Sequence, residues 1–432
     1  MSSRAGNRRT GWFVPAGPGS RVTRLELLYD LVFVYAFVNL ANTLSHRVTA
    51  GTLLAGGVVL ALLWYCWSSF ALLGNAVRAD QGLIPVAGAA IMVLAFVLAL
   101  TIPEAFVDRS GGLPGPVAFA VCYLAVRLIT TGAYWLVPGA TGRPARQIWA
   151  LSAPGLAATA LILAAALLPH AVARPGGAAW LRLGLWLAAV LVEYAAGFAL
   201  PYARLAVTSA GHWAERHGQI VLIALGESVL SLGVGAGLGE GLTLTWPVVG
   251  TAALGVVLIA LLWWSYFDTL ASSVEQAMHG TRGQERITLG RDAYTYLHLP
   301  LIAGVIGTAL GLKLIVGAAA APDRSQPHTV EVAVLYVGVA LYILSVAAVV
   351  FRTFRTIRYA SIGTAALLAA LAVPASRLPA VAALALLTAI GLSLTLVHRF
   401  VGAAARTRVR EAALHEQEAV EAATNRWRGT HL

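Results

Sequence analysis

Long apolar windows recur along almost the whole chain, and they restrict the possible fold more than any other feature. Each is close to the length of about 17–25 residues that an α-helix needs to cross a bilayer. The chain of 432 residues is 59% hydrophobic and only 11% charged, whereas soluble domains average about 25% charged residues. The sequence therefore predicts an all-α polytopic membrane protein with about 12 transmembrane helices. The windows lie at 24–45, 51–74, 83–101, 115–136, 147–168, 178–200, 217–236, 246–268, 291–318, 330–351, 357–373 and 379–401.

Basic residues are distributed unevenly over the predicted loops. With the N-terminus inside, the inner segments hold 22 of the 30 Lys and Arg residues, the outer loops hold six, and the spans hold Arg127 and Lys313. Basic residues concentrate in the cytoplasmic loops of such proteins. We therefore expect a multi-pass protein of the bacterial cytoplasmic (inner) membrane with both termini in the cytoplasm. The formal charge of +11 forms no basic face, which argues against a nucleic-acid partner.

The two halves of the chain resemble each other. The similar segments keep their chain order, and six helices per half would give both halves the same orientation in the membrane. We predict a 6+6 tandem parallel repeat, and chance similarity among Ala- and Leu-rich helices is the alternative. The similar pairs are ALLWYCWSSF (61–70) with ALLWWSYFDT (260–269), ELLYDLVFVYAF (26–37) with ERHGQIVLIALG (215–226), and LIPVAGAAIM (83–92) with HLPLIAGVIG (298–307). The predicted organisation is a cytoplasmic Arg-rich N-tail (1–23), a first repeat (24–200), a second repeat (201–401) and a cytoplasmic C-terminal tail (402–432).

Ionisable residues in or beside the predicted spans are candidates for function, because a charge at the bilayer centre costs about 2.5–3.5 kcal/mol on insertion scales. The larger set lies toward the predicted cytoplasmic side. Glu26 and Asp30 share one face of the first helix, at i and i+4. Their alternative role is to satisfy the N-terminus of that helix. The remaining members are Arg78 and Asp80 after the second helix, His212, Glu215, Arg216 and His217 before the seventh, Asp268 at the end of the eighth, and Asp292 and His298 at the start of the ninth.

A second set lies deeper in the predicted spans and comprises Arg127, Glu193, Glu227 and Lys313. Glu227 follows Arg216 on nearly the same face of the seventh helix, but too far along it for a direct contact. It therefore needs Arg127 or Lys313 as a counter-ion, or a bound proton. The alternative is that Arg127 forms a structural pair with Glu193 or Glu227.

Three segments carry a family resemblance. RLELLYDLVFVYAF (24–37), HWAERHGQIVLIALGES (212–228) and RDAYTYLHLPLIAG (291–304) resemble the bacterial low temperature requirement A (LtrA) family. The similarity runs from about residue 20 to 400, with Tyr29 where the family usually has phenylalanine. The resemblance implies a multi-spanning inner-membrane protein but no activity, since the family is named for a growth phenotype. The signature positions are Glu26, Asp30, His212, Glu215, Arg216, His217, Glu227, Asp292 and His298.

Three functions remain in competition at this point. The leading hypothesis is a transporter or channel-like protein for an ion or small solute, because parallel-repeat transporters bind substrates at the repeat interface. The second is an intramembrane enzyme acting on a lipid-like or isoprenoid diphosphate substrate, in which carboxylates hold Mg²⁺. The third is a non-catalytic membrane component of a stress or cold response. The candidate catalytic residues are Glu215, Glu227, Asp268, Asp292 and His298, and the candidate substrate- or ion-binding residues are Glu26, Asp30, Arg127, Glu193, His212, Arg216, His217, Glu227 and Lys313.

Cofactors and metals receive little support from the sequence. No HExxH motif and no cysteine cluster occurs, so no metal site is predicted. Mg²⁺ is implied only by the diphosphate alternative. The expected partners are the lipid bilayer and a small solute, ion or lipid-like substrate.

Overall fold

A computed structural model describes residues 14–17, 19–106, 111–136, 145–172, 177–199, 207–235, 244–321, 327 and 329–401, with scattered positions beyond. The predicted N-tail and C-terminal tail fall mostly outside these residues. The elements are the helices α1 (Arg24–Ser45), α2 (Ala50–Ala76), α3 (Ile84–Leu100), α4 (Gly115–Trp135), α5 (Ala145–Val172), α6 (Ala178–Ala199), α7 (Ala210–Gly235), α8 (Trp246–Phe267), α9 (Leu270–Gly280), α10 (Gly283–Leu289), α11 (Leu297–Ala320), α12 (Thr329–Phe354), α13 (Tyr359–Leu371) and α14 (Ala380–Val401), the 3-10 turns η2 (Ile102–Glu104) and η4 (Pro374–Arg377), and the π-helix η3 (Gly290–Tyr296).

The protein is an all-helical membrane protein. Within the described residues, nine helices are long and apolar enough to cross a bilayer. The remaining three windows correspond to shorter apolar helices at 84–100, 152–168 and 359–371. Large apolar side chains such as Val86, Val93 and Leu191 are exposed on the outer faces of the helices, where lipid would cover them. The count of twelve crossings and the tandem repeat remain predictions.

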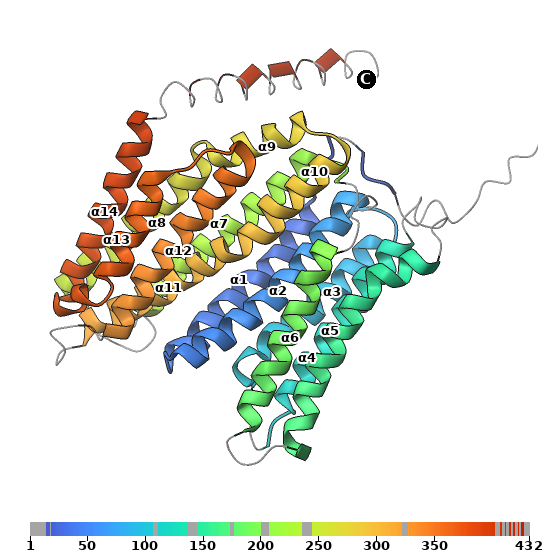
Figure 1. Ribbon diagram of the computed structural model, residues 1–432, viewed down its shortest axis with the longest axis horizontal. Coiled ribbons are helices and arrows are strands. Elements are labelled where there is room, and N and C mark those ends of the chain that lie inside the picture. Colours follow the sequence, from blue (N-terminus) through green and yellow to red (C-terminus); the bar gives the residue numbers. More distant parts are fainter. Residues whose placement is uncertain are drawn as a thin grey trace, which may run out of the picture.

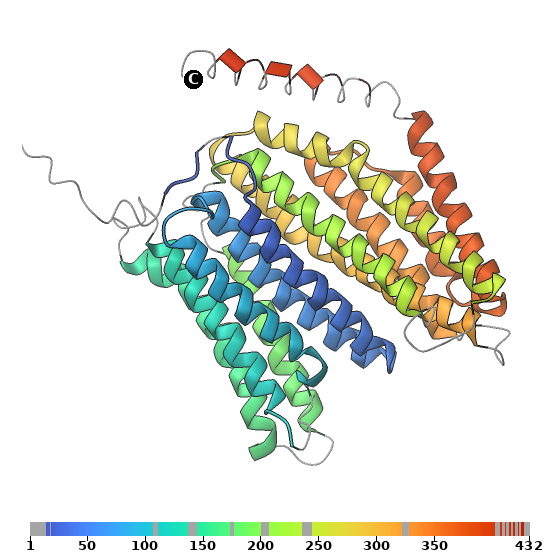
Figure 2. The same cartoon turned by 180° about the vertical axis from the view of Figure 1, so that it is seen from behind.

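The helices form two groups on either side of α1 and α2 (Figures 1 and 2). One group contains α3 to α6, and the other contains α7 to α14. Figure 1 shows the two groups diverging toward the end of the bundle where α1 finishes. We call the end where α1 begins the proximal end and the end where it finishes the distal end. Helix α1 contacts both α7 and α11, so it joins the two halves of the chain.

Helix α7 begins earlier than the apolar window predicts. The structure has α7 starting at Ala210, so His212, Glu215, Arg216 and His217 lie inside the helix and do not precede it. Its first turn is capped by Ser209, whose hydroxyl accepts a hydrogen bond from the backbone N–H of His212 at 3.2 Å. A hydropathy window leaves out this polar turn, because hydropathy along the sequence carries no information on which polar side chains the tertiary fold buries.

The predicted ninth helix is also longer and less regular than expected. It begins at α10, passes through the π-helix η3, and continues as α11. Pro300 lies inside α11 and has no N–H to donate to the carbonyl of Tyr296, which is the last residue of η3. The wider π turn therefore adjoins a position where regular α-helical bonding is interrupted. The preceding helix α9 has no counterpart among the predicted spans.

Helices α11 and α12 approach each other closely at glycines. A Cβ atom on Gly311 would lie 2.5 Å from the Cα of Leu335, and one on Gly338 would lie 2.6 Å from the backbone nitrogen of Thr308. Backbone atoms cannot give way as a flexible side chain can. Small residues allow membrane helices to gain van der Waals contact without a hydrophobic driving force. These glycines therefore hold the core of the second half together.

We predict that Gly338→Ala destabilises the protein by about 1–3 kcal/mol, the usual cost of overpacking. The measurement is the thermal unfolding midpoint of the purified protein in mild detergent. Gly363→Ala in α13 is the matched control, because its Cβ would meet nothing within 4 Å. Equal midpoints for the two variants would contradict close packing of α11 on α12.

Candidate functional site

Two carboxylates at the start of α1 lie against two basic side chains of α7. Nε2 of His212 is 2.9 Å from a carboxylate oxygen of Glu26, and Nη1 of Arg216 is 2.6 Å from Oδ2 of Asp30. Nε of Arg216 also lies 3.7 Å from Glu26. All four side chains are buried. We call Glu26, Asp30, His212 and Arg216 the proximal network; the structure brings together the groups that the sequence placed at the starts of these two helices.

Capping explains only part of the role of Glu26. Its Oε2 accepts hydrogen bonds from the backbone N–H and the hydroxyl of Thr23, each at 2.9 Å, which completes a capping box. Its Oε1 faces His212. Asp30 lies beyond the first turn and has no capping role. The alternative that these acids merely satisfy the helix end therefore does not account for their contacts with α7.

Helix α2 supplies residues of this network that the sequence analysis did not identify. The indole N–H of Trp67 donates to Oδ1 of Asp30 at 2.9 Å. The Asn75 amide bonds to the backbone of Thr208 and Ser209 and lies 3.3 Å from Nδ1 of His212. At Gly74, an added Cβ would collide with the Glu26 carboxylate. These three residues are uncharged, so the sequence does not single them out. They are identified only by their position on α2, which packs against the proximal network.

Two histidines on α7 and α11 lie next to the network, in an aromatic enclosure. The ring of His217 packs against those of Trp64, Trp67 and His298, with centroids 5.9, 4.9 and 5.3 Å away. Its Nδ1 is 2.8 Å from the carbonyl oxygen of Trp213, whereas its Nε2 is buried without a hydrogen-bond partner among the described residues. This nitrogen is therefore available to a ligand or a proton that enters the enclosure.

His298 is held on both ring nitrogens. Its Nδ1 lies 2.8 Å from the carbonyl oxygen of Ala293, and its Nε2 lies 2.8 Å from the hydroxyl of Tyr266. Because a carbonyl only accepts, Nδ1 carries the proton and Nε2 accepts from the tyrosine. The Ala293 carbonyl belongs to the π-helix η3, so the irregular turn positions this ring.

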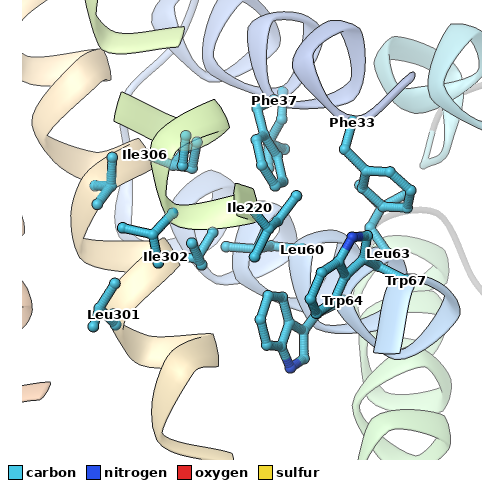
Figure 3. Packing of buried hydrophobic residues seen from close by; sticks show 14 of the residues in the cluster. Phe33, Phe37, Leu60, Leu63, Trp64, Trp67, Ile220, Leu301, Ile302 and Ile306 are labelled. Atoms are coloured by element: carbon cyan, nitrogen blue, oxygen red, sulfur yellow. The ribbon is translucent and has the colours of Figure 1, made fainter. Parts of the chain in front are cut away.

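A layer of apolar side chains follows the proximal network toward the distal end. Figure 3 shows Phe33 and Phe37 of α1, Ile220 of α7, and Ile302 and Ile306 of α11 packed around one region of the core. All five are buried. In sequence, the α1 members follow Asp30, and Ile220 lies between Arg216 and Glu227. We call these five residues the apolar layer; along α7 it lies between the level of the proximal network and the level of Glu227.

Glu227 is fully buried on the distal side of the apolar layer. Its Oε1 accepts a hydrogen bond from the hydroxyl of Ser231 at 2.6 Å, and its Oε2 has no hydrogen-bond partner among the described residues. The contacts of α1 with α7 join residues 186 apart in sequence. If the same offset of 186 residues continues along the two helices, Glu227 of α7 lies at the same height in the bundle as Ala41 of α1.

Lys313 of α11 is a charged residue that lies against the distal end of α1. Its ammonium group donates to the side chains of Asn42 at 2.7 Å and Ser45 at 2.8 Å, both at the distal end of α1. We call Glu227, Ser231, Lys313, Asn42 and Ser45 the distal set. Like the proximal network, it joins α1 to helices of the second half.

Arg127 is not the counter-ion of Glu227. Its Nε lies 3.3 Å from Glu193, and its Nη1 donates to Ser69 at 2.7 Å. The hydroxyl of Tyr123 donates to the same Glu193 carboxylate at 3.0 Å. The pair is buried within the first half and joins α4 to α6 and α2, so it is the structural pair that the sequence analysis left open.

The remaining candidates lie elsewhere at the proximal end. Asp292 is held by two arginines, with Oδ1 2.6 Å from Arg291 and Oδ2 2.8 Å from Arg352. Glu215 accepts a hydrogen bond from the backbone N–H of Val22 at 3.3 Å, next to the Thr23 cap of α1. Asp268 caps the C-terminal end of α8 and lines a separate cavity. These acids therefore do not converge on one catalytic centre.

Comparison with known proteins establishes the family. Residues 21–396 match the family described as Bacterial low temperature requirement A protein (LtrA). This chain belongs to the LtrA family. The matched range contains the proximal network, the apolar layer and Glu227. The chain is also 27% identical over 305 residues, 66% of its length and 67% of the relative's, to Uncharacterized protein RA0937 of Rhizobium meliloti (strain 1021). No solved structure matches it.

We predict that Glu227 is protonated in the membrane, because a buried carboxylate without a close counter-ion favours its neutral form. Dicyclohexylcarbodiimide, which reacts with protonated carboxyl groups in apolar surroundings, should modify Glu227 and leave Glu193, paired with Arg127, unmodified. Peptide mass spectrometry after labelling in membranes measures both sites. Equal modification of the two carboxyl groups would show that pairing does not distinguish them.

We further predict that Asp30→Asn strongly destabilises the protein, by about 3–5 kcal/mol, because it leaves Arg216 buried beside only one carboxylate. Thermal unfolding in detergent measures the loss. Asp80→Asn is the control, since Asp80 forms an exposed pair with Arg78 at 2.8 Å whose loss should cost less than about 1 kcal/mol. A destabilisation of Asp30→Asn as small as that of the control would refute the proposed role of the network.

Proposed function

We propose that this LtrA-family protein is a transporter of the bacterial cytoplasmic membrane that couples a proton or cation to the movement of a small solute. The observation that carries the proposal is Glu227, a buried carboxylate on α7, the helix that contacts α1 of the first half; one of its oxygens has no hydrogen-bond partner among the described residues. Such a group exchanges a proton or cation when its surroundings open. Ionisable residues within spans mark ion and substrate pathways in membrane proteins.

The contacts between the halves suggest how access would change. The proximal network and the distal set both join α1 to the second half, and the apolar layer closes the space between them. We propose that the proximal network parts in one state, and that the contacts of Lys313 with Asn42 and Ser45 part in the other. Relative motion of the halves around a fixed site is the usual basis of alternating access.

Glu227 and Lys313 would then perform the coupling. With Glu227 ionised, its charge balances the nearby ammonium of Lys313 or holds a cation. With Glu227 protonated, the ammonium charge is left for an anionic group of the solute. Each step needs only the loss or gain of a proton at the carboxylate of Glu227.

The arginine distribution supports the orientation. With the proximal end in the cytoplasm, the basic residues lie mainly on the cytoplasmic side, as the sequence predicts. The proximal network would then be the cytoplasmic gate, and the distal set would lie toward the outside.

The contacts of the acidic residues favour transport over diphosphate chemistry. An enzyme of that kind would use carboxylates to hold Mg²⁺. Both oxygens of Asp292 contact arginines, and Glu26 and Asp30 contact His212 and Arg216. These acids are therefore already balanced by basic side chains, whereas Glu227 has no close ion pair with any described residue.

We predict that Glu227→Gln abolishes pH-dependent transport, because the amide cannot exchange a proton or balance a cation. The measurement is the charge displacement of proteoliposomes on a solid-supported membrane after concentration jumps of KCl, NaCl, sodium phosphate and a mixture of the twenty amino acids. At least one jump should give a pH-dependent current with the wild type, reduced to background in the variant.

Glu285→Gln is the matched control for this experiment. Glu285 is an exposed glutamate of α10 outside both polar sets, so its loss should leave the current unchanged. Currents of equal size and pH dependence in the wild type and Glu227→Gln would contradict the coupling role. Silence of the wild type to the whole panel would favour the non-catalytic alternative.

A further inference from the structure

A cavity of about 310 Å³ opens between α8, α12, α13 and α14 at the proximal end. It is separate from the proximal network and from Glu227. One part of its lining is polar and the other part is apolar. The polar part includes Arg358, Arg399, His398, Ser361 and Asp268, and the apolar part includes Trp264, Ile343, Val346, Phe354 and Leu394.

Arg358 is the distinctive residue of this cavity. It lies between α12 and α13, with its side chain half-buried. Burial lowers the pKa of its guanidinium group, and no carboxylate of the described residues offsets the effect of burial. A charged guanidinium in such a place has five donors in a planar fork that matches the oxygens of a phosphate. Arg358 is therefore prepared for an anion that the described residues do not supply.

Neighbouring groups add to the attraction for an anion. Arg399 lies over the ring of Trp264, with its Cζ 5.7 Å from the ring centroid. His398 is 3.3 Å from the hydroxyl of Ser361, in the first turn of α13. Arg358 is the N-cap residue of α13, and among the described residues it makes no side-chain cap hydrogen bond to that turn. Asp268 is the one acid in the lining, against two arginines.

The apolar part of the lining indicates that the anion is carried on a hydrophobic molecule. Trp264 and Phe354 are 39% and 43% exposed at the end of the bundle. Beyond them, Ile343, Val346 and Leu394 line the cavity on the side of the apolar helices. A soluble phosphate compound would leave this part without a partner, whereas acyl chains would cover it. Basic pockets between membrane helices bind lipid headgroups in this manner.

We propose that this cavity binds an anionic phospholipid, with the phosphate at Arg358 and the acyl chains along α8, α12 and α14. The hydroxyls of a glycerol headgroup find acceptors in Asp268 and the neighbouring Ser265 and Thr269. The site is independent of the transport mechanism proposed above, because none of its residues belongs to the proximal network or the distal set.

The test is native mass spectrometry of the full chain in detergent, titrated with phosphatidylglycerol or phosphatidylcholine. We expect the wild type to bind phosphatidylglycerol at least about tenfold more tightly than phosphatidylcholine. Arg358→Gln should weaken phosphatidylglycerol binding at least about tenfold, the loss expected for one charge-assisted contact. Arg358→Lys should retain part of the affinity, because it keeps the charge without the fork.

Arg355→Gln is the matched control. Arg355 is exposed three residues away and stacks on Phe351, outside the cavity. Equal lipid binding by Arg358→Gln and Arg355→Gln, at equal thermal stability, would overturn the site. A third titration uses glycerol 3-phosphate in phospholipid-free detergent. Binding as tight as that of phosphatidylglycerol would overturn the assignment to a lipid and identify a soluble phosphate ester as the ligand.

Discussion

The contact on which the rest of this protein depends is the one between Arg216 of α7 and Asp30 of α1. A guanidinium and a carboxylate buried together, with Glu26, His212 and the Trp67 indole around them, fix α1 against α7. Removing either charge would leave the other buried without its closest counter-ion, which is costly in an apolar interior. The apolar layer and the level of Glu227 relative to α1 both follow from this alignment. The same contact joins the two halves of the chain, so it is also a point where their relative motion would be controlled.

Buried charges in this fold serve different purposes, which their contacts distinguish. Arg127 and Glu193 lie within one half and are satisfied by Ser69 and Tyr123, as expected of a structural pair. Asp292 is held between two arginines near the proximal end. Glu227 differs from both, because one of its oxygens has no partner in the described part of the chain and it lies on α7, which contacts α1 of the other half. Belonging to the LtrA family does not by itself assign these roles, which is why the argument for transport rests on Glu227.

Much of the candidate site could be predicted from the sequence, but not its pairing. The spacing of Glu26 and Asp30 on one face, and of His212 and Arg216 on another, identified groups that the structure brings together. The partner of Arg127 was open between two glutamates, since spacing along a chain does not determine which helices are neighbours. Gly74, Asn75 and Trp67 are uncharged, so a search for charged residues in apolar segments does not identify them. They contribute because α2 packs against the proximal network. Which helices pack against each other is decided by the tertiary structure.

The sequence by itself determined that this is a helical membrane protein, because its apolar windows can satisfy their backbone hydrogen bonds in a bilayer only as helices. It also determined which residues are costly to bury. The tertiary structure alone decided where the polar turn of α7 begins, that apolar side chains pack between the levels of the two sets of charges, and that Arg127 pairs with Glu193 and not with Glu227. The physical reason is that hydrophobicity is a local property that can be summed along a window. The stability of a buried charge, in contrast, depends on which side chain lies within about 4 Å of it in space.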